Sequence, residues 1–281
     1  MVGSTGLQVL SEPGALTVPV LMAALVAALL YTVGVSVSRG VILALVPWMV
    51  VGGAAHAIYT VDAFDEWVEI FFGPIAVYFT TFVLAGIAWS MMSVAAEIAG
   101  EQRRDAQYLT AAGTGAALIV GGVALTTGDG ASSSQIYPTF GGMLVALVVA
   151  GVGYLLLSIV YSKGVVQTDV LGYFVVAGQT LDAVMAAVSV EYFHLPPSTT
   201  FDARVLSVAG SLPTADTLGA GWLLIVVKLS LGLAVVSLVG YLLTVDLLGE
   251  RPEPAYLCLG LGAAVGIGPG LHRFFSLLIG V

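Results

Sequence analysis

The sequence predicts an all-α polytopic membrane protein, a bundle of about eight transmembrane helices in a single integral membrane domain spanning residues 1–281. Of these residues, 59% are hydrophobic and only 9% are charged, and the mean hydropathy is +1.05. Soluble domains carry about a quarter charged residues, so this chain has too few charged side chains to cover a water-facing globule. Apolar runs of about 20 residues, the length that crosses a bilayer as a helix, recur along the chain.

Eight runs have this length, and we expect each to be helical because a backbone inside lipid must satisfy its own hydrogen bonds. No basic residue precedes the first run, which favours a retained span over a signal peptide. The eight predicted spans cover residues 16–37, 41–60, 70–94, 108–127, 138–161, 170–190, 219–245 and 255–279.

Basic residues predict the orientation of these spans. Loops 61–69 and 128–137 contain no Lys or Arg, and loop 191–218 contains only Arg204. The alternate loops contain the other basic loop residues: Arg39, Arg103, Arg104, Lys163 and Arg251. Because cytoplasmic loops are enriched in Lys and Arg, the basic loops are predicted to lie in the cytoplasm. Both termini are then predicted to lie outside the cell membrane.

A faint internal repeat suggests a duplication of four plus four helices. The segment 38–41 (SRGV) after the first span is similar to 162–165 (SKGV) after the fifth. The segment 113–118 is similar to 260–265 in the same way. The halves would be 1–127 and 138–281, with loop 191–218 as a longer outer segment, and parallel repeats of this kind are related by an axis along the membrane normal.

Two opposite charges lie inside the predicted spans at matching depth. Lys228 is about 13 Å from the outer end of its span, and Asp182 is about 12 Å from the outer end of the preceding one. Each alone would cost about 2.5–3.5 kcal/mol on insertion scales. We therefore expect a Lys228–Asp182 pair near the midplane, with Gln179 as a candidate third member. The pair is either a structural ion pair or a site for ions, protons or substrate, and its cost favours the second interpretation.

All three histidines, His56, His194 and His272, are predicted on the outer side, with Glu191 at similar height. Together they could hold zinc or another divalent metal. However, no HxxxH or HExxH spacing places two ligands on one helix face, so no metal is predicted, and this set of four remains an alternative.

Further residues are candidates for an outer vestibule above the charged pair. Arg273 is positioned to receive an anionic group or lipid phosphate, and Trp48 lies halfway along the second span. Loop 191–218 is too polar to span the membrane and is a candidate lid, in which Asp202 is expected to cap a short interfacial helix.

Charge and cysteine content exclude several classes of partner and cofactor. The net charge of −9 and the pI of about 4.5 argue against a nucleic-acid partner. Membrane lipids and a small solute, ion or lipid-like ligand remain. The single Cys258 excludes a disulfide within the chain. A lysine in the seventh span superficially resembles that of microbial rhodopsins, but the preceding Asp is missing and there is one span too many, so retinal is not predicted.

Several segments together resemble a known family. They are 47–64 (PWMVVGGAAHAIYTVDAF), 73–79 (GPIAVYF), 191–194 (EYFH) after the Asp182 helix, the Lys228 helix ending in Val245-Asp246, and 266–274 (GIGPGLHRF). This set resembles an archaeal family of multispanning membrane proteins, the sixty-third domain of unknown function, over nearly the whole chain. The resemblance implies an archaeal, haloarchaeal membrane protein and assigns no activity, and the acidic composition agrees with a halophilic source.

These observations favour a transporter or permease for a small solute or ion, with the charged pair beneath an outward-opening polar pocket. The residues expected to line the entrance of this pocket are His56, Glu191, His194, His272 and Arg273. One alternative is an intramembrane enzyme, metal-dependent or not, acting on lipid or isoprenoid through the outer histidines and Glu191. Another is a non-catalytic subunit of a membrane complex.

Overall fold

A computed structural model of the protein describes residues 16–100, 104–128, 130–245 and 251–280. All regular elements in these ranges are helices, without a strand, which confirms the predicted all-α fold. Arg103, Asp129 and Asp246, which belong to the predicted loops and motifs, lie outside the described residues.

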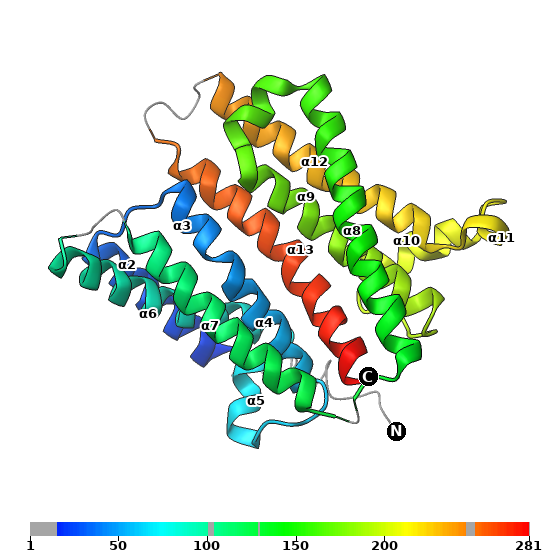
Figure 1. The fold of residues 1–281 in the computed structure, drawn as a ribbon, viewed down its shortest axis with the longest axis horizontal. Coiled ribbons are helices and arrows are strands. Elements are labelled where there is room, and N and C mark those ends of the chain that lie inside the picture. Colours follow the sequence, from blue (N-terminus) through cyan, green and yellow to red (C-terminus); the bar gives the residue numbers. More distant parts are fainter. Residues whose placement is uncertain (1–15, 101–103, 129, 246–250, 281) are drawn as a thin grey trace. The chain divides into compact units, whose positions relative to one another are not determined.

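The chain forms two compact units, which are described separately: unit 1 within residues 1–128 and unit 2 within residues 129–280. Unit 1 contains α2 (Thr17–Val33), α3 (Arg39–Ala44), α4 (Val46–Tyr59), α5 (Glu66–Phe72), α6 (Ala76–Ile98) and α7 (Asp105–Thr126). Within this unit α4 packs on α7 and α2 packs on α6 (Figure 1). Its apolar core includes Trp48, Trp89 and Leu109.

Unit 2 is built around α9. It contains α8 (Ser133–Val160), α9 (Ser162–Glu191), α10 (Thr200–Gly210), α11 (Ala215–Leu218), α12 (Gly221–Thr244) and α13 (Glu253–Ile279). Helices α8, α12 and α13 all pack on α9, which lies between them in Figure 1. Most residues of α9 are therefore buried, whereas α8 exposes a broad apolar face that includes Leu144, Val148 and Leu155.

Seven helical segments of the described chain are long and apolar enough to cross a membrane: Arg39–Tyr59, Ala76–Ile98, Asp105–Thr126, Ser133–Val160, Ser162–Glu191, Gly221–Thr244 and Glu253–Ile279. The first predicted span corresponds to α2, which has only 17 residues. That length reaches about 26 Å, short of the roughly 30 Å hydrocarbon layer. The chain is thus a multi-pass helical membrane protein, and its described residues contain seven full-length candidate spans.

Two predicted spans differ from the observed helices. The third was expected to begin at residue 70, but Gly73 and Pro74 separate α5 from α6, since proline cannot donate to an α-helical ladder. The sixth was expected at 170–190 after a loop containing Lys163. In the structure Lys163 lies in the first turn of α9, and only Tyr161 connects α8 to α9.

Helix α9 contains a backbone break at Asp169, where φ is 48° and ψ is −140°. This left-handed φ is costly for a non-glycine residue. Tyr154 on α8 stabilises the break, because its hydroxyl donates to the Asp169 carbonyl oxygen at 2.5 Å. The break divides α9 into a short segment and a long one.

The long segment of α9 makes backbone contact with α13. A Cβ added to Gly266 would lie 2.3 Å from the carbonyl carbon of Gly178, and one added to Gly270 would lie 2.9 Å from the Asp182 amide nitrogen. The glycines of α13 thus allow close packing on α9. It brings the polar groups of α9 and α13 within reach of each other.

Candidate functional site

The contact that the sequence predicts between Lys228 and Asp182 is present. Lys228 Nζ on α12 donates to Asp182 Oδ2 on α9 at 2.5 Å. Both residues are buried, with 6% of each exposed. The pair joins α12 to α9 near one end of unit 2, where α9 ends and α12 begins. We call this end of unit 2 the tetrad end, after the cluster of four charges described next.

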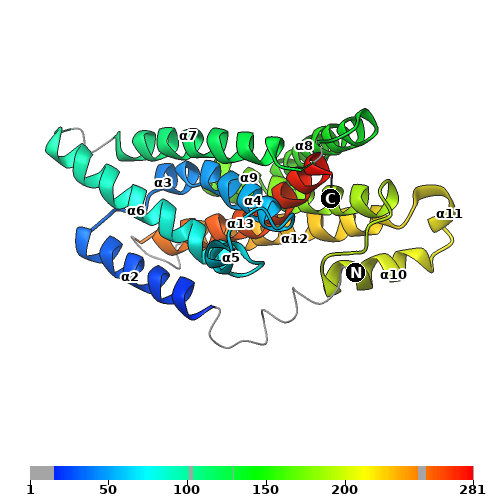
Figure 2. The same cartoon turned by 90° about the horizontal axis from the view of Figure 1, so that it is seen from below.

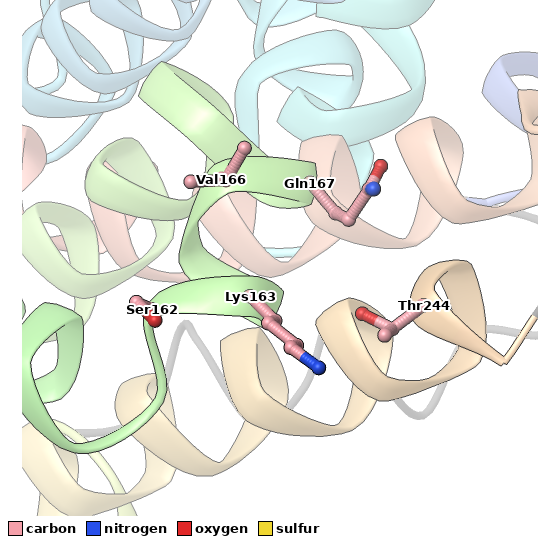
Figure 3. Close-up of a pocket in the computed structure, with 5 residues that line it drawn as sticks. All are labelled: Ser162, Lys163, Val166, Gln167 and Thr244. Carbon is pink, nitrogen blue, oxygen red and sulfur yellow. The ribbon is translucent and has the colours of Figure 1, made fainter.

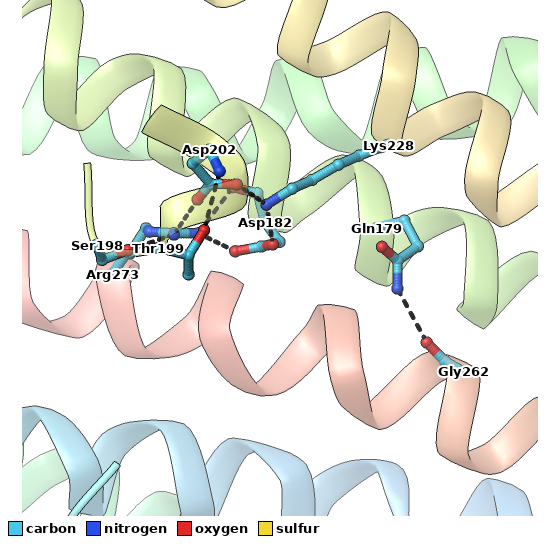
Figure 4. Close-up of polar contacts among 8 residues, drawn as sticks. All are labelled: Gln179, Asp182, Ser198, Thr199, Asp202, Lys228, Gly262 and Arg273. Carbon is cyan, nitrogen blue, oxygen red and sulfur yellow. Dashed lines mark hydrogen bonds and ion pairs between the residues drawn. The ribbon is translucent and has the colours of Figure 1, made fainter. Parts of the chain in front are cut away.

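Two further charges complete the cluster (Figure 4). Arg273 on α13 donates through Nη1 to Asp182 Oδ1, and through Nη2 to Asp202 Oδ2 at 2.7 Å. Asp202 belongs to α10, and its Oδ1 lies 2.7 Å from Lys228 Nζ. We call Asp182, Asp202, Lys228 and Arg273 the charge tetrad.

The tetrad is a closed ring of alternating charges. Each carboxylate bridges the same two cations, one oxygen facing Lys228 and the other facing Arg273. Arg273 also donates to the Asp182 carbonyl oxygen at 3.1 Å and to Ser198 Oγ at 2.5 Å. The planar guanidinium suits such multiple contacts because its N–H donors form a rigid fork.

The tetrad is electrically neutral and almost wholly removed from solvent. Arg273 is 8% exposed and Asp202 is fully buried. Two carboxylates and two cations cancel, so the cluster places no net charge in the low-dielectric interior. Removing one member would leave an uncompensated buried charge, which costs far more than the pair itself contributes.

The depth of the tetrad follows from the helix ends. Asp182 lies nine residues before the end of α9, Lys228 seven after the start of α12, and Arg273 six before the end of α13. At 1.5 Å per residue these positions lie about 14, 10 and 9 Å inside the helix ends. The tetrad therefore lies between the tetrad end and the middle of the bundle.

Helix α10 reaches the tetrad with its first turn. Thr199 caps the helix, since its hydroxyl accepts the Asp202 amide at 3.0 Å. The expected capping role of Asp202 is thus wrong: its carboxylate belongs to the tetrad. Asp202, Leu206 and Ala209 are the buried residues of α10 and share one face at spacings of four and three.

The rest of this α10 face is apolar and packs on the spans. Leu206 belongs to a buried cluster with Ala183 and Ala186 of α9 and Leu224 of α12. Figure 2 shows α10 running alongside α12. Helix α10 is therefore held at its first turn by charge and along its length by a small apolar contact. The lid expected in loop 191–218 stays a prediction.

Glu191 and the unit 2 histidines lie outside the tetrad. Glu191 Oε1 accepts the amides of Ala220 and Gly221, at 2.5 and 2.9 Å, at the start of α12. His194 is exposed in the loop after α9 with a φ of 54°. His272 is half-buried on α13, with Nδ1 3.5 Å from Ser276 Oγ.

Gln179 also lies outside the tetrad. Its amide nitrogen donates to the Gly262 carbonyl oxygen on α13 at 3.2 Å (Figure 4). The expectation that Gln179 is the third member beside Lys228 and Asp182 is therefore wrong: Gln179 strengthens the α9–α13 contact, and Arg273 and Asp202 join the pair instead.

His56 and Trp48 belong to unit 1. His56 Nδ1 donates to the Phe72 carbonyl oxygen of α5 at 2.7 Å, and its ring stacks on Tyr59. Trp48 is buried in the core of this unit and donates to the Leu109 carbonyl oxygen of α7 at 3.3 Å. These contacts give both side chains a packing role within unit 1.

A metal centre finds no support in the described part of the chain, where no group of three or more His, Cys, Asp or Glu side chains is arranged to hold an ion. Glu191, one of the four candidate ligands, uses its carboxylate to bind the first amides of α12.

A cavity of about 300 Å³ lies at the opposite end of unit 2, between the start of α9 and the end of α12 (Figure 3). Its lining residues are Ser162, Lys163, Val166, Gln167 and Thr244. Asp182 lies 13 residues after the break at Asp169, or about 20 Å along the long segment of α9, and Lys163 lies on the other side of the break. Helices α9 and α12 thus contribute to the buried ion cluster towards one end of unit 2 and to this cavity at the other.

Sequence reasoning missed Asp202 as a tetrad member, although a signal for it exists. Asp182, Lys228 and Arg273 lie inside predicted spans and sum to one positive charge, so a buried set of these three requires one more acid. Asp202 is the only acidic residue between Glu191 and Asp216. Charge balance across helices would have pointed to it.

Comparison of the chain with protein-family models, with curated proteins and with solved structures found no match.

Proposed function

We propose that the protein is a transporter or permease for a small solute or ion, and that the charge tetrad is the outer gate of its pathway. Helix α10 is the lid of this gate. The single observation that carries the proposal is the attachment of α10, a helix outside the membrane spans, to two spans, α12 and α13, through one buried carboxylate, that of Asp202.

The distribution of the four charges supports a gate that opens on one side. Asp182, Lys228 and Arg273 lie in long membrane helices, whereas Asp202 lies on an 11-residue helix between two loops. Only Asp202 can leave the tetrad without moving a span. Its departure would expose the other three charges to the solution at the tetrad end.

Features at the other end of unit 2 support a cycle of alternating access. Helix α9 is broken at Asp169, as transporter helices often are near their pathways. The cavity lined by Lys163 and Gln167 lies beyond this break. The described arrangement then corresponds to a state closed at the tetrad and accessible at the opposite end.

The topology and origin expected from the sequence belong to the same proposal. The tetrad end would face the outside and the Lys163 cavity the cytoplasm, because basic residues mark cytoplasmic loops. A haloarchaeal source within the archaeal family named above would account for the net charge of −9.

A reversible lock on α10 tests the gate. Leu206→Cys and Leu224→Cys place two thiols in the apolar cluster between α10 and α12, in a Cys258→Ser background. The protein is reconstituted in liposomes, and uptake is measured for a panel of inorganic ions, amino acids, monocarboxylates and sugars. We expect wild-type uptake of one solute class, a block of this uptake when the pair is oxidised, and recovery after reduction.

Each single-cysteine variant is the matched control and should transport under both conditions. Uptake that is unchanged when the disulfide is formed would contradict the lid. Liposomes without protein-dependent uptake of any solute in the panel would contradict transport and favour a structural role for the tetrad.

A further inference from the structure

The Asp202 carboxylate occupies a site that a soluble carboxylate can also fill. Its two oxygens lie 2.7 Å from Lys228 Nζ and 2.7 Å from Arg273 Nη2. Beyond the Cα atom, an aspartate side chain has the shape and charge of acetate. The side chain is fully buried, so the protein encloses this shape on all sides.

The charges that remain when Asp202 leaves define the ligand that replaces it. Lys228 and Arg273 then share the single carboxylate of Asp182, which leaves one excess positive charge among these three residues. One monovalent anion restores neutrality, whereas a divalent anion such as phosphate would overcompensate it. The two nitrogens are spaced for the two oxygens of one carboxylate, and Arg forms such paired contacts readily.

We infer that the solute is a small monocarboxylate, and that it enters by displacing Asp202 from Lys228 and Arg273. This inference rests on the transport function proposed above and names its substrate class. Asp202 acts as a built-in substitute for the substrate: it keeps the cations paired while the gate is closed and leaves with α10 when a soluble carboxylate takes its position.

Exposure of the buried face of α10 reports the displacement. Ala209 on this face is fully buried, and Val208 next to it is 56% exposed. Ala209→Cys and Val208→Cys are each made in a Cys258→Ser background and labelled with a water-soluble thiol reagent. The purified protein is labelled in sodium acetate and in sodium chloride of equal ionic strength.

We expect acetate to raise the labelling rate of Ala209→Cys several-fold, with saturation, and to leave that of Val208→Cys unchanged. An equal rate in acetate and chloride at Ala209→Cys would overturn the displacement of Asp202. A rate that rises equally at both positions would also overturn it, because the effect would then not be specific to the buried face.

Two variants of Asp202 test the carboxylate site itself. Asp202→Ala removes the side chain and opens a space of acetate size, so acetate should raise its thermal unfolding temperature more than chloride does. Asp202→Asn fills the same space, and acetate should give it no such gain. If Asp202→Ala does not fold, the labelling result at Ala209→Cys decides alone.

The outcomes separate this inference from the proposed function. Acetate-dependent labelling without any protein-dependent uptake would retain the carboxylate site and overturn transport. Another outcome is uptake of a different solute class that the α10 lock blocks, while acetate has no effect on labelling. This outcome would retain the transport function and overturn the inference that the solute is a monocarboxylate. Stabilisation of Asp202→Ala by acetate without faster labelling of Ala209→Cys would make Asp202 a permanent link and overturn the displacement.

Discussion

At the scale of single residues, the tetrad shows how four ionised groups share a buried site. Asp182 and Asp202 each contact both Lys228 and Arg273, so every charge has two opposite neighbours. In a low-dielectric interior the balance matters more than any one contact, since a neutral ring avoids the penalty of an isolated charge. The four residues should therefore behave as a unit when substituted.

Substitutions that restore neutrality should be less harmful than those that break it. Lys228→Met leaves one excess negative charge and should lower the free energy of unfolding by about 3–5 kcal/mol. Asp202→Asn leaves one excess positive charge and should also destabilise the protein. The double variant, Lys228→Met with Asp202→Asn, is neutral again. We therefore expect it to lose less free energy of unfolding than the sum of the losses of the two single variants. Equilibrium unfolding in detergent measures this double-mutant cycle, and additive losses would show that the tetrad does not act as a unit.

At the scale of the elements, the contact between α9 and α13 positions the tetrad. Gly266, Gly270 and Arg273 lie on one face of α13, at spacings of four and three. Gly178 and Asp182 face them on α9 at a spacing of four. Small residues allow the two backbones to approach so closely that the Arg273 guanidinium reaches both the side chain and the carbonyl oxygen of Asp182.

Gly266→Ala tests this contact. Its Cβ would lie 2.3 Å from the Gly178 carbonyl carbon, so the helices must separate. We expect a loss of about 1–3 kcal/mol in the free energy of unfolding, as for other overpacked interiors. Gly151→Ala on α8 is the matched control, because no atom lies within 4 Å of its added Cβ. Equal thermal unfolding temperatures for the two variants would show that the backbone contact does not limit stability.

At the scale of the whole chain, each of the two compact units contains one of the two similar segments that suggest a duplication. The segments 38–41 and 162–165 each lie at the start of a helix. The helix of unit 2 breaks at Asp169, where φ is 48°, whereas Leu45 in unit 1 keeps helical dihedrals, with a φ of −81° and a ψ of −13°. The duplication therefore stays a prediction. All four tetrad residues lie in unit 2, so a duplicated ancestor would have specialised one half.

The predicted topology is open to direct measurement. Ser134 and Ser162 are exposed near opposite ends of α8. Each is replaced by cysteine in a Cys258→Ser background and treated with a membrane-impermeant maleimide in right-side-out vesicles. Ser134→Cys should react in sealed vesicles, and Ser162→Cys only after permeabilisation, because basic loops are predicted to be cytoplasmic. The reverse pattern would invert the proposed direction of the gate.

The sequence by itself determined the membrane class, the positions of most spans and the pairing of Lys228 with Asp182. These follow from hydropathy, from helix length and from the cost of a lone charge in lipid, all of which depend on local sequence or on depth. The tertiary structure alone decided that Arg273 turns inward to Asp182, that Gln179 serves the α9–α13 contact, and that Asp202 returns from the segment between α9 and α12 to complete the ring. The physical reason is that depth along a helix can be read from residue number, whereas the direction a side chain faces depends on which helices pack together.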